Sequence, residues 1–224
     1  GVTHLTANSN GAATLFWMGA AQTMSGFVTT LHSQVVDLLS GTQLGVASFL
    51  PDGNRFTCVA PKQLTAGRSQ TTRHVIALTN GFGSTCNLDL IQVDTFAGTT
   101  IPQRMNPVGT TIDTYQPIIA MSPAGDTLAV WAESPAGSNG PATVKWSQSL
   151  AGGPWSVPAV LVPGGGIGQS MLGLYNFSLA MNANGQVAVA ATALVNTNNA
   201  YLTVARFSFS SGWSNWQIIA DTLS

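Results

Sequence analysis

The most regular feature of the chain is a polar turn centred on a glycine and followed at once by a strongly apolar segment. The clearest copies are Ser122–Asp126 before Thr127–Trp131, and Asn182–Gly185 before Gln186–Ala191. Two further copies begin at Asn8 and Pro51, so that the turn glycines are Gly11, Gly53, Gly125 and Gly185. Asn, Asp and Gly tolerate the positive φ of tight hairpin turns. The pattern therefore predicts four hairpins.

The segment after each turn is apolar on both faces, as in Leu128–Trp131 and Val187–Ala190. An antiparallel sheet with one solvated face would alternate apolar and polar residues instead. Strands buried on both sides in a Gly-rich repeat indicate small sheets stacked face to face, as in propeller blades.

A second unit, made of a strand, a Gly-Trp turn and another strand, follows the first in the later copies. Its segments are Ala142–Ser149, Ala151–Ser156, Val157–Val162, then Tyr201–Ser208, Ser210–Ser214 and Trp216–Ala220. The fold class is thus all-β and propeller-like, with about four antiparallel four-stranded blades in a single domain, either a complete ring or part of a larger propeller. The approximate blades are 1–46, 47–110, 111–166 and 167–224.

The first half of the chain repeats less clearly. Gly26–Gln34 and Val35–Leu39 are assigned as the outer strands of the first blade, and His74–Thr79 and Cys86–Val93 as those of the second. Gln34–Leu39 can also be interpreted as a short helix, although its two valines favour a strand.

The segment Trp146–Ser156 resembles a degenerate Asp box, the Ser-x-Asp-x-Gly-x-x-Trp turn of sialidase-type (BNR) propeller repeats, without its aspartate. The resemblance covers the two C-terminal copies and implies a propeller. A sialidase would also need three convergent arginines, a tyrosine nucleophile paired with a glutamate, and an acid aspartate. Glu133 is the only glutamate, and no tyrosine matches the catalytic position. The resemblance therefore implies repeats without catalysis.

Charged residues make up only 7% of the chain, and its net charge is −1. The five arginines are scattered, so nucleic acid is not an expected partner. No apolar run approaches the roughly 20 residues of a membrane span, so membrane insertion is not expected, and the composition is typical of a secreted or cell-surface protein. His4, His32 and His74 lie far apart and form no short-spaced ligand pair; hence we expect no metal and no cofactor.

The acidic residues do not suggest a glycosidase, which needs two carboxylates flanking the scissile bond. Asp52 and Asp126 are better explained as turn residues, and Asp89 and Asp94 as polar residues at strand ends. The sequence therefore predicts that the chain is not an enzyme. Cys58 and Cys86 either form one disulfide or remain two buried thiols.

Tryptophans are the remaining candidates for function. Trp17 and Trp131 occupy the same place after the Gly turn and are interpreted as packing between blades. Trp155 and Trp213 either pin the Gly-Trp turn or, with Trp216, present a ring to a sugar, because exposed indoles stack on the apolar faces of sugars.

These observations favour a non-catalytic, lectin-like or adhesin-like module that binds a glycan or a protein partner at a surface. A structural subunit of a surface layer, filament or larger complex is the first alternative, since a surface so poor in charge protects weakly against self-association. A glycosidase-like enzyme is the second alternative.

Overall fold

The computed structural model describes residues 3–7, 12–23, 26–37, 40–49, 64–68, 73–80, 87–94, 99–106, 112–135, 143–161, 173–194 and 200–221. Every regular element within these ranges is a β-strand, and all the strand pairs are antiparallel. The described part of the chain holds no apolar helix of membrane-spanning length. The predicted all-β fold class is confirmed.

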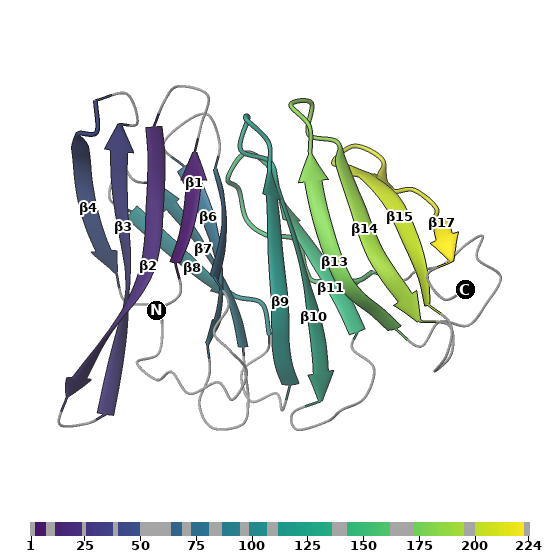
Figure 1. The fold of residues 1–224 in the computed structure, drawn as a ribbon, viewed down its shortest axis with the longest axis horizontal. Helices are drawn as coiled ribbons and strands as arrows, with labels where there is room; N and C mark the ends of the chain where they lie inside the picture. Colours follow the sequence, from purple (N-terminus) through teal and green to yellow (C-terminus); the bar gives the residue numbers. More distant parts are fainter. Residues whose placement is uncertain are drawn as a thin grey trace.

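The strands form four sheets in chain order, which we call blades 1 to 4 (Figure 1). Blade 1 contains β1 (Thr3–Ala7), β2 (Ala12–Thr23), β3 (Gly26–Asp37) and β4 (Gln43–Phe49). Blade 2 contains β5 (Leu64–Arg68), β6 (Arg73–Asn80), β7 (Asn87–Asp94) and β8 (Thr99–Arg104). Blade 3 contains β9 (Ile112–Met121), β10 (Thr127–Pro135), β11 (Thr143–Ser149) and β12 (Ala159–Val160). Blade 4 contains β13 (Gly173–Met181), β14 (Val187–Leu194), β15 (Ala200–Ser208), β16 (Gly212–Trp213) and β17 (Gln217–Asp221).

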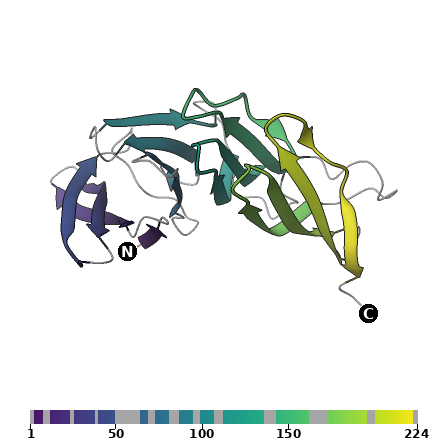
Figure 2. The same ribbon diagram turned by 90° about the horizontal axis from the view of Figure 1, so that it is seen from above.

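The first strand of each blade lies next to the first strand of its neighbour. β5 contacts both β1 and β9, and β9 also contacts β13. Seen from above, the blades follow one another along an open arc, with the two chain ends at opposite ends of the arc (Figure 2). We call β1, β5, β9 and β13 the inner strands.

The interface between blades 2 and 3 is built around Trp131, which is fully buried. It lies in one apolar cluster with Val75 and Ala77 of β6, Leu88 of β7 and the ring of Trp155. Because side chains alternate along a strand, Trp131 and Ala129 share the face of β10 that packs on blade 2.

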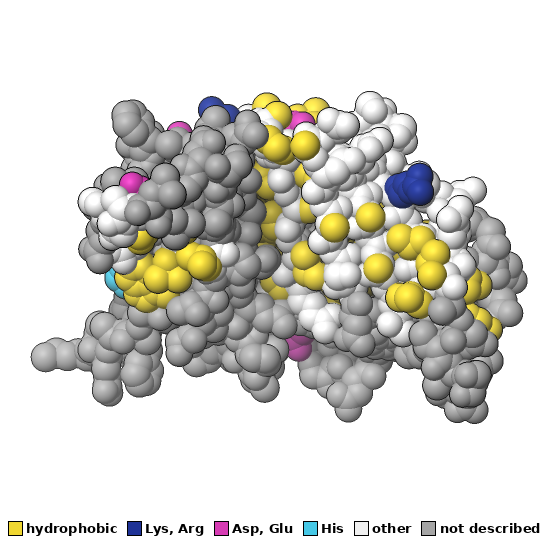
Figure 3. All heavy atoms as spheres, turned by 45° about the horizontal axis from the view of Figure 1, so that its top comes forward, with side chains coloured by type: hydrophobic (Ala, Val, Ile, Leu, Met, Phe, Trp, Pro, Cys, Tyr) yellow, Lys and Arg dark blue, Asp and Glu magenta, His cyan; other side chains and the backbone are white. Residues whose placement is uncertain are grey.

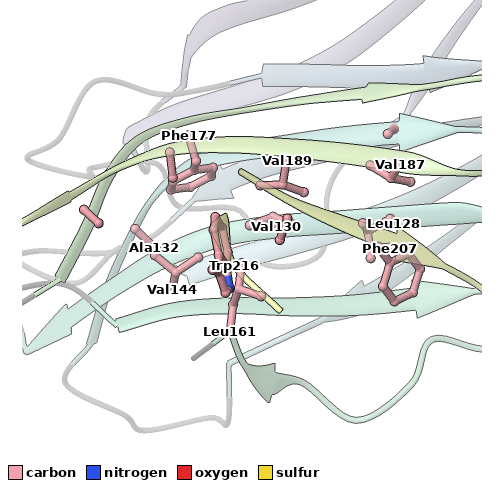
Figure 4. Close-up of a cluster of buried hydrophobic side chains, with 14 residues drawn as sticks. Leu128, Val130, Ala132, Val144, Leu161, Phe177, Val187, Val189, Phe207 and Trp216 are labelled. Carbon is pink, nitrogen blue, oxygen red and sulfur yellow. The ribbon is translucent and has the colours of Figure 1, made fainter. Parts of the chain in front are cut away.

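The opposite face of β10 forms the interface between blades 3 and 4 (Figure 4). Leu128 and Val130 lie there against Val187 and Val189 of β14, with the ring of Trp216 beside them. β10 is therefore buried on both faces along almost its whole length, as the sequence predicts for its apolar segment Leu128–Trp131.

The two described Gly turns have the same geometry. Gly125 has φ +97° and Gly185 has φ +75°. In each turn the glycine N–H donates to the residue three positions earlier, Ser122 at 2.9 Å and Asn182 at 3.1 Å. The predicted turn glycines Gly11 and Gly53, like Cys58 and Cys86, lie outside the described residues.

The first half of the chain differs from its predicted strand boundaries. The two strands expected over residues 26–39 are one strand, β3, and the fourth strand of blade 1 is β4. No helix replaces the described part of Gln34–Leu39, because β3 pairs with β2 as far as Asp37. In blade 2 the hairpin after the inner strand joins β5 to β6, while the segment Arg55–Val59, expected to follow the turn, lies outside the described residues. A Gly turn alone does not fix which two strands it joins.

Candidate functional site

The inner strands of blades 3 and 4 carry the same irregularity. In β9, Gln116 and Pro117 together lie opposite the single residue Trp131 of β10. In β13, Asn176 and Phe177 lie opposite Ala191 of β14 in the same way. Such β-bulges bend a strand and are frequent next to active sites.

Both bulges come directly after a tyrosine. Tyr115 pairs with Ala132 and Tyr175 with Thr192, which are seven positions beyond the turn glycines of their blades. Gln116 has φ +52°, in the left-handed region that non-glycine residues rarely adopt. The bulges therefore mark corresponding places along the inner edge of the arc, near the ends where β9 and β13 begin.

A buried polar cluster lies beside the bulge of β9. It is centred on Glu133, which is only 5% exposed. One carboxylate oxygen, Oε1, accepts hydrogen bonds from the Trp131 indole at 2.7 Å and the Asn106 amide at 2.8 Å. The other, Oε2, lies 2.7 Å from the Lys145 ammonium. The carboxylate thus has a donor on each oxygen and a balancing charge.

The backbone register explains how this cluster forms. Glu133 is two residues beyond Trp131 on β10, so both side chains lie on the face toward blade 2. Asn106, which follows β8, donates to Thr114 at 3.0 Å and accepts from the backbone N–H of Leu88 at 2.8 Å. We call Asn106, Thr114, Trp131, Glu133 and Lys145 the Glu133 cluster. It connects blade 2 to the first residues of the inner strand β9.

A second carboxylate belongs to the same end of blade 3. Asp113 is the second residue of β9, is half-buried, and pairs with Ser134, the neighbour of Glu133. The described residues contain no group of three His, Cys, Asp or Glu side chains that could hold a metal ion. Because side chains alternate along a strand, Asp113 lies on the opposite face of blade 3 from Glu133. What this end of the blade offers chemically is one half-buried carboxylate, Asp113, and one buried carboxylate, Glu133, near a bulged inner strand.

The sequence analysis did not single out the Glu133 cluster. Glu133 is the only glutamate and Lys145 one of two lysines. A signal was present, because residues 131 and 133 share a face and a charge beside a buried tryptophan requires a partner.

The structure separates the three tryptophans predicted as sugar platforms. Trp155 is 7% exposed in the core between blades 2 and 3, and Trp216 is 4% exposed in the core between blades 3 and 4. Buried rings offer no face for stacking. Trp213 is half-buried against Phe207 and Trp146, with ring centroids 4.9 and 5.8 Å away. It lines a depression of about 700 Å³, and its role in ligand binding stays a prediction.

The Gly-Trp turns are held by serine hydroxyls. Ser156 Oγ accepts from the Gln148 N–H at 3.1 Å, and Ser214 Oγ accepts from the Arg206 N–H at 2.9 Å in the equivalent place. In blade 3, Asp126 also accepts from the Ala151 N–H at 2.9 Å. An aspartate from the neighbouring Gly turn thus binds the backbone of a turn whose own motif lacks one.

Comparisons with known proteins identify the fold. No protein-family model matches the chain, and no curated protein matches it by sequence. A solved ulvan lyase of polysaccharide lyase family PL25, bound to a saccharide of GlcA and sulfated Rha, has a TM-score of 0.62 at 13% identity over 99% of this chain. This chain covers about half of that enzyme, 55% of its length.

Two other solved structures match almost as much of the chain. The α-L-arabinofuranosidase of Fusarium graminearum has a TM-score of 0.54 at 8% identity, covering 97% of this chain and 66% of its own. An endo-arabinase from Bacteroides thetaiotaomicron has a TM-score of 0.51 at 9% identity, covering 99% of this chain and 80% of its own.

These comparisons correct one prediction. The expectation that the chain is not an enzyme is contradicted, because solved structures that share its fold along nearly its whole length include a polysaccharide lyase, an α-L-arabinofuranosidase and an endo-arabinase. The sequence argument relied on the absence of known catalytic patterns, and such an absence does not exclude an enzyme. The chain has the β-propeller fold that these carbohydrate-active enzymes use.

Proposed function

We propose that this chain belongs to a carbohydrate-active propeller enzyme that cleaves a polysaccharide outside the cell. The observation that supports the proposal most is the match of 97–99% of the chain to three enzymes that act on glycans. Fold alone does not determine chemistry, so the proposal also depends on the end of the arc where β9 begins.

Asp113 is our candidate for the carboxylate that contacts the substrate. It stands at the beginning of an inner strand and is half-buried, so part of it faces solvent. Glycosidases use one carboxyl group to protonate the leaving oxygen and another to act as base or nucleophile. We assign one of these roles to Asp113.

Glu133 fits the role of a positioning residue. Three donors occupy its two oxygens, and its burial leaves little room for a sugar. Its contacts to Asn106 and, through that amide, to Thr114 hold the first residues of β9. Glu133 would therefore act on the reaction only through the placement of Asp113.

The test is a polysaccharide panel with the 224-residue chain, including arabinan, arabino-oligosaccharides and ulvan. Hydrolysis appears as new reducing ends, and elimination appears as reducing ends together with the ultraviolet absorbance of an unsaturated uronate. Asp113→Asn should lower the rate about 10²–10⁴-fold, the usual contribution of an acid–base group, with little change in melting temperature.

Asp126→Asn is the matched control, since Asp126 is also half-buried but lies at the opposite end of the same blade. It should keep the rate. Full activity in the Asp113 variant would refute that assignment, and no cleavage of any glycan would refute the enzyme proposal. Binding without cleavage would instead return the lectin-like hypothesis.

A further inference from the structure

Each blade has a backward face toward the preceding blade and a forward face toward the following one. In β10 the forward face carries Leu128 and Val130, both completely buried against blade 4. Counted from the turn glycine, the same positions in blade 4 are Ala188 and Ala190. Ala188 is exposed and Ala190 half-buried. The forward face of blade 4 therefore corresponds to a face that forms an interface in blade 3, but no described blade covers it.

The backward face of blade 1 is the complementary case. Thr14 and Phe16 point to His74 of blade 2. The Thr14 hydroxyl lies 3.4 Å from His74 Nε2, and the centroids of the Phe16 and His74 rings are 5.3 Å apart. By alternation, Leu15 and Trp17 point the other way. Trp17, only half-buried, stacks on His32 with centroids 5.1 Å apart.

Leu5 extends this backward face, because it pairs with Leu15 and is 62% exposed. In Figure 3, hydrophobic side chains gather beside a histidine at the end of the arc that holds blade 1. An exposed cluster of large apolar side chains usually marks an interaction site.

The interface between blades 2 and 3 shows what such faces pack against. Trp131 occupies the same position after the turn glycine as Trp17 and becomes fully buried on the small side chains Val75 and Ala77 of blade 2. The forward face of blade 4 is also small, with Ala180 and Ala188 paired across its first two strands.

This forward face is also hollow. Two depressions, the one of about 700 Å³ that Trp213 also lines and another of about 480 Å³, both reach Ala188 and Arg206. A face bearing Trp17 and leucines has the bulk to fill them, and a guanidinium such as that of Arg206 can stack on an indole.

We propose that two copies of this chain associate head to tail, with the backward face of blade 1 in each copy packed on the forward face of blade 4 in the other. The pairing continues the order of faces along the chain. It produces two identical interfaces related by a twofold axis along the inner strands, which closes the arc into a ring. The second copy would thereby complete the arc of blades that Figure 2 shows.

Size-exclusion chromatography with light scattering tests the association. The chain of 23.2 kDa should elute at twice that mass. Ala188→Arg places a charge in the proposed interface and should give the monomer mass with unchanged circular dichroism. Ala159→Arg, at another exposed alanine on the outer strand β12, should remain a dimer. A monomeric wild-type chain, or equal effects of both variants, would overturn the proposal.

A mixing experiment tests the head-to-tail arrangement. Leu5→Arg should also give monomers, because it disrupts the backward face. A mixture of the Leu5→Arg and Ala188→Arg variants contains one intact pair of faces per dimer, so it should form a hetero-dimer that dissociates at higher concentration than the wild type. No hetero-dimer in the mixture would exclude this arrangement, as would a mass that grows without limit with concentration, since a ring of two copies is closed.

Discussion

Replacing Trp131 by alanine should destabilise the chain more than any other single change that we consider. On folding, the side chain is transferred completely from water into a packed cluster, since its exposed fraction in the structure is 0%. Truncation of a buried Trp to Ala costs about 3–5 kcal/mol through lost burial and the remaining cavity. Because whole domains have about 5–15 kcal/mol of stability, the variant should unfold at a much lower urea concentration.

Trp131→Phe separates packing from hydrogen bonding. Phenylalanine keeps most of the ring contacts but cannot donate to Glu133, which the indole reaches at 2.7 Å. Loss of a donor from a buried group costs about 1–3 kcal/mol. We expect a loss of that size for Trp131→Phe and clearly more for Trp131→Ala.

Urea titrations followed by far-ultraviolet circular dichroism measure both losses, and Trp213→Ala serves as the control at a half-buried tryptophan. Trp213→Ala should cost less than Trp131→Ala. A loss below about 1 kcal/mol for Trp131→Ala would refute the interblade packing, because the cluster could not then depend on that ring. Equal losses for the Phe and Ala variants would show that the hydrogen bond alone matters.

Three further tests address other contacts. Lys145→Met leaves Glu133 buried without its counter-charge and should cost toward the lower end of about 3–5 kcal/mol, since 27% of the lysine side chain reaches water; adding Glu133→Gln should restore part of the loss in urea titrations. Gly185→Val, at φ +75°, should cost about 1–3 kcal/mol, and an unchanged melting temperature would contradict the strain. Ser214→Ala removes an exposed hydrogen bond and should cost less than about 1 kcal/mol, whereas Ser156→Ala, whose hydroxyl is part-buried and also lies 3.2 Å from another serine hydroxyl, should cost more by calorimetry.

The second half of the chain was predictable because local and long-range signals agree there. The Gly turns, the apolar segment Thr127–Trp131 and the Gly-Trp turn each specify a strand boundary, and the observed β10 and β15 begin at or next to the predicted residues. In the first half these signals conflict. β3 continues through Val35 because its long pairing with β2 outweighs any local break.

The candidate site was less predictable than the fold. A sequence shows which residues share a strand face, but not that Asn106 after β8 reaches Glu133 on β10 at 2.8 Å. That contact depends on how two blades stack. The bulges at Gln116 and after Tyr175 are likewise set by register with the neighbouring strand, and no glycine marks them.

The two ends of blades 3 and 4 differ in a way that favours one end for chemistry. At the end with the Gly turns, backbone groups are satisfied by short local bonds, such as those of Ser122 and Asn182, so these turns have little left to offer a ligand. At the other end the inner strands bulge, and two of the chain's eight acidic residues, Asp113 and Glu133, lie near the start of β9 and the end of its partner β10. Retaining a buried ion pair in so uncharged a protein costs desolvation that an apolar pair would avoid. Stability alone does not explain why the chain keeps this ion pair. We infer that the pair is kept because it holds the start of β9 in place.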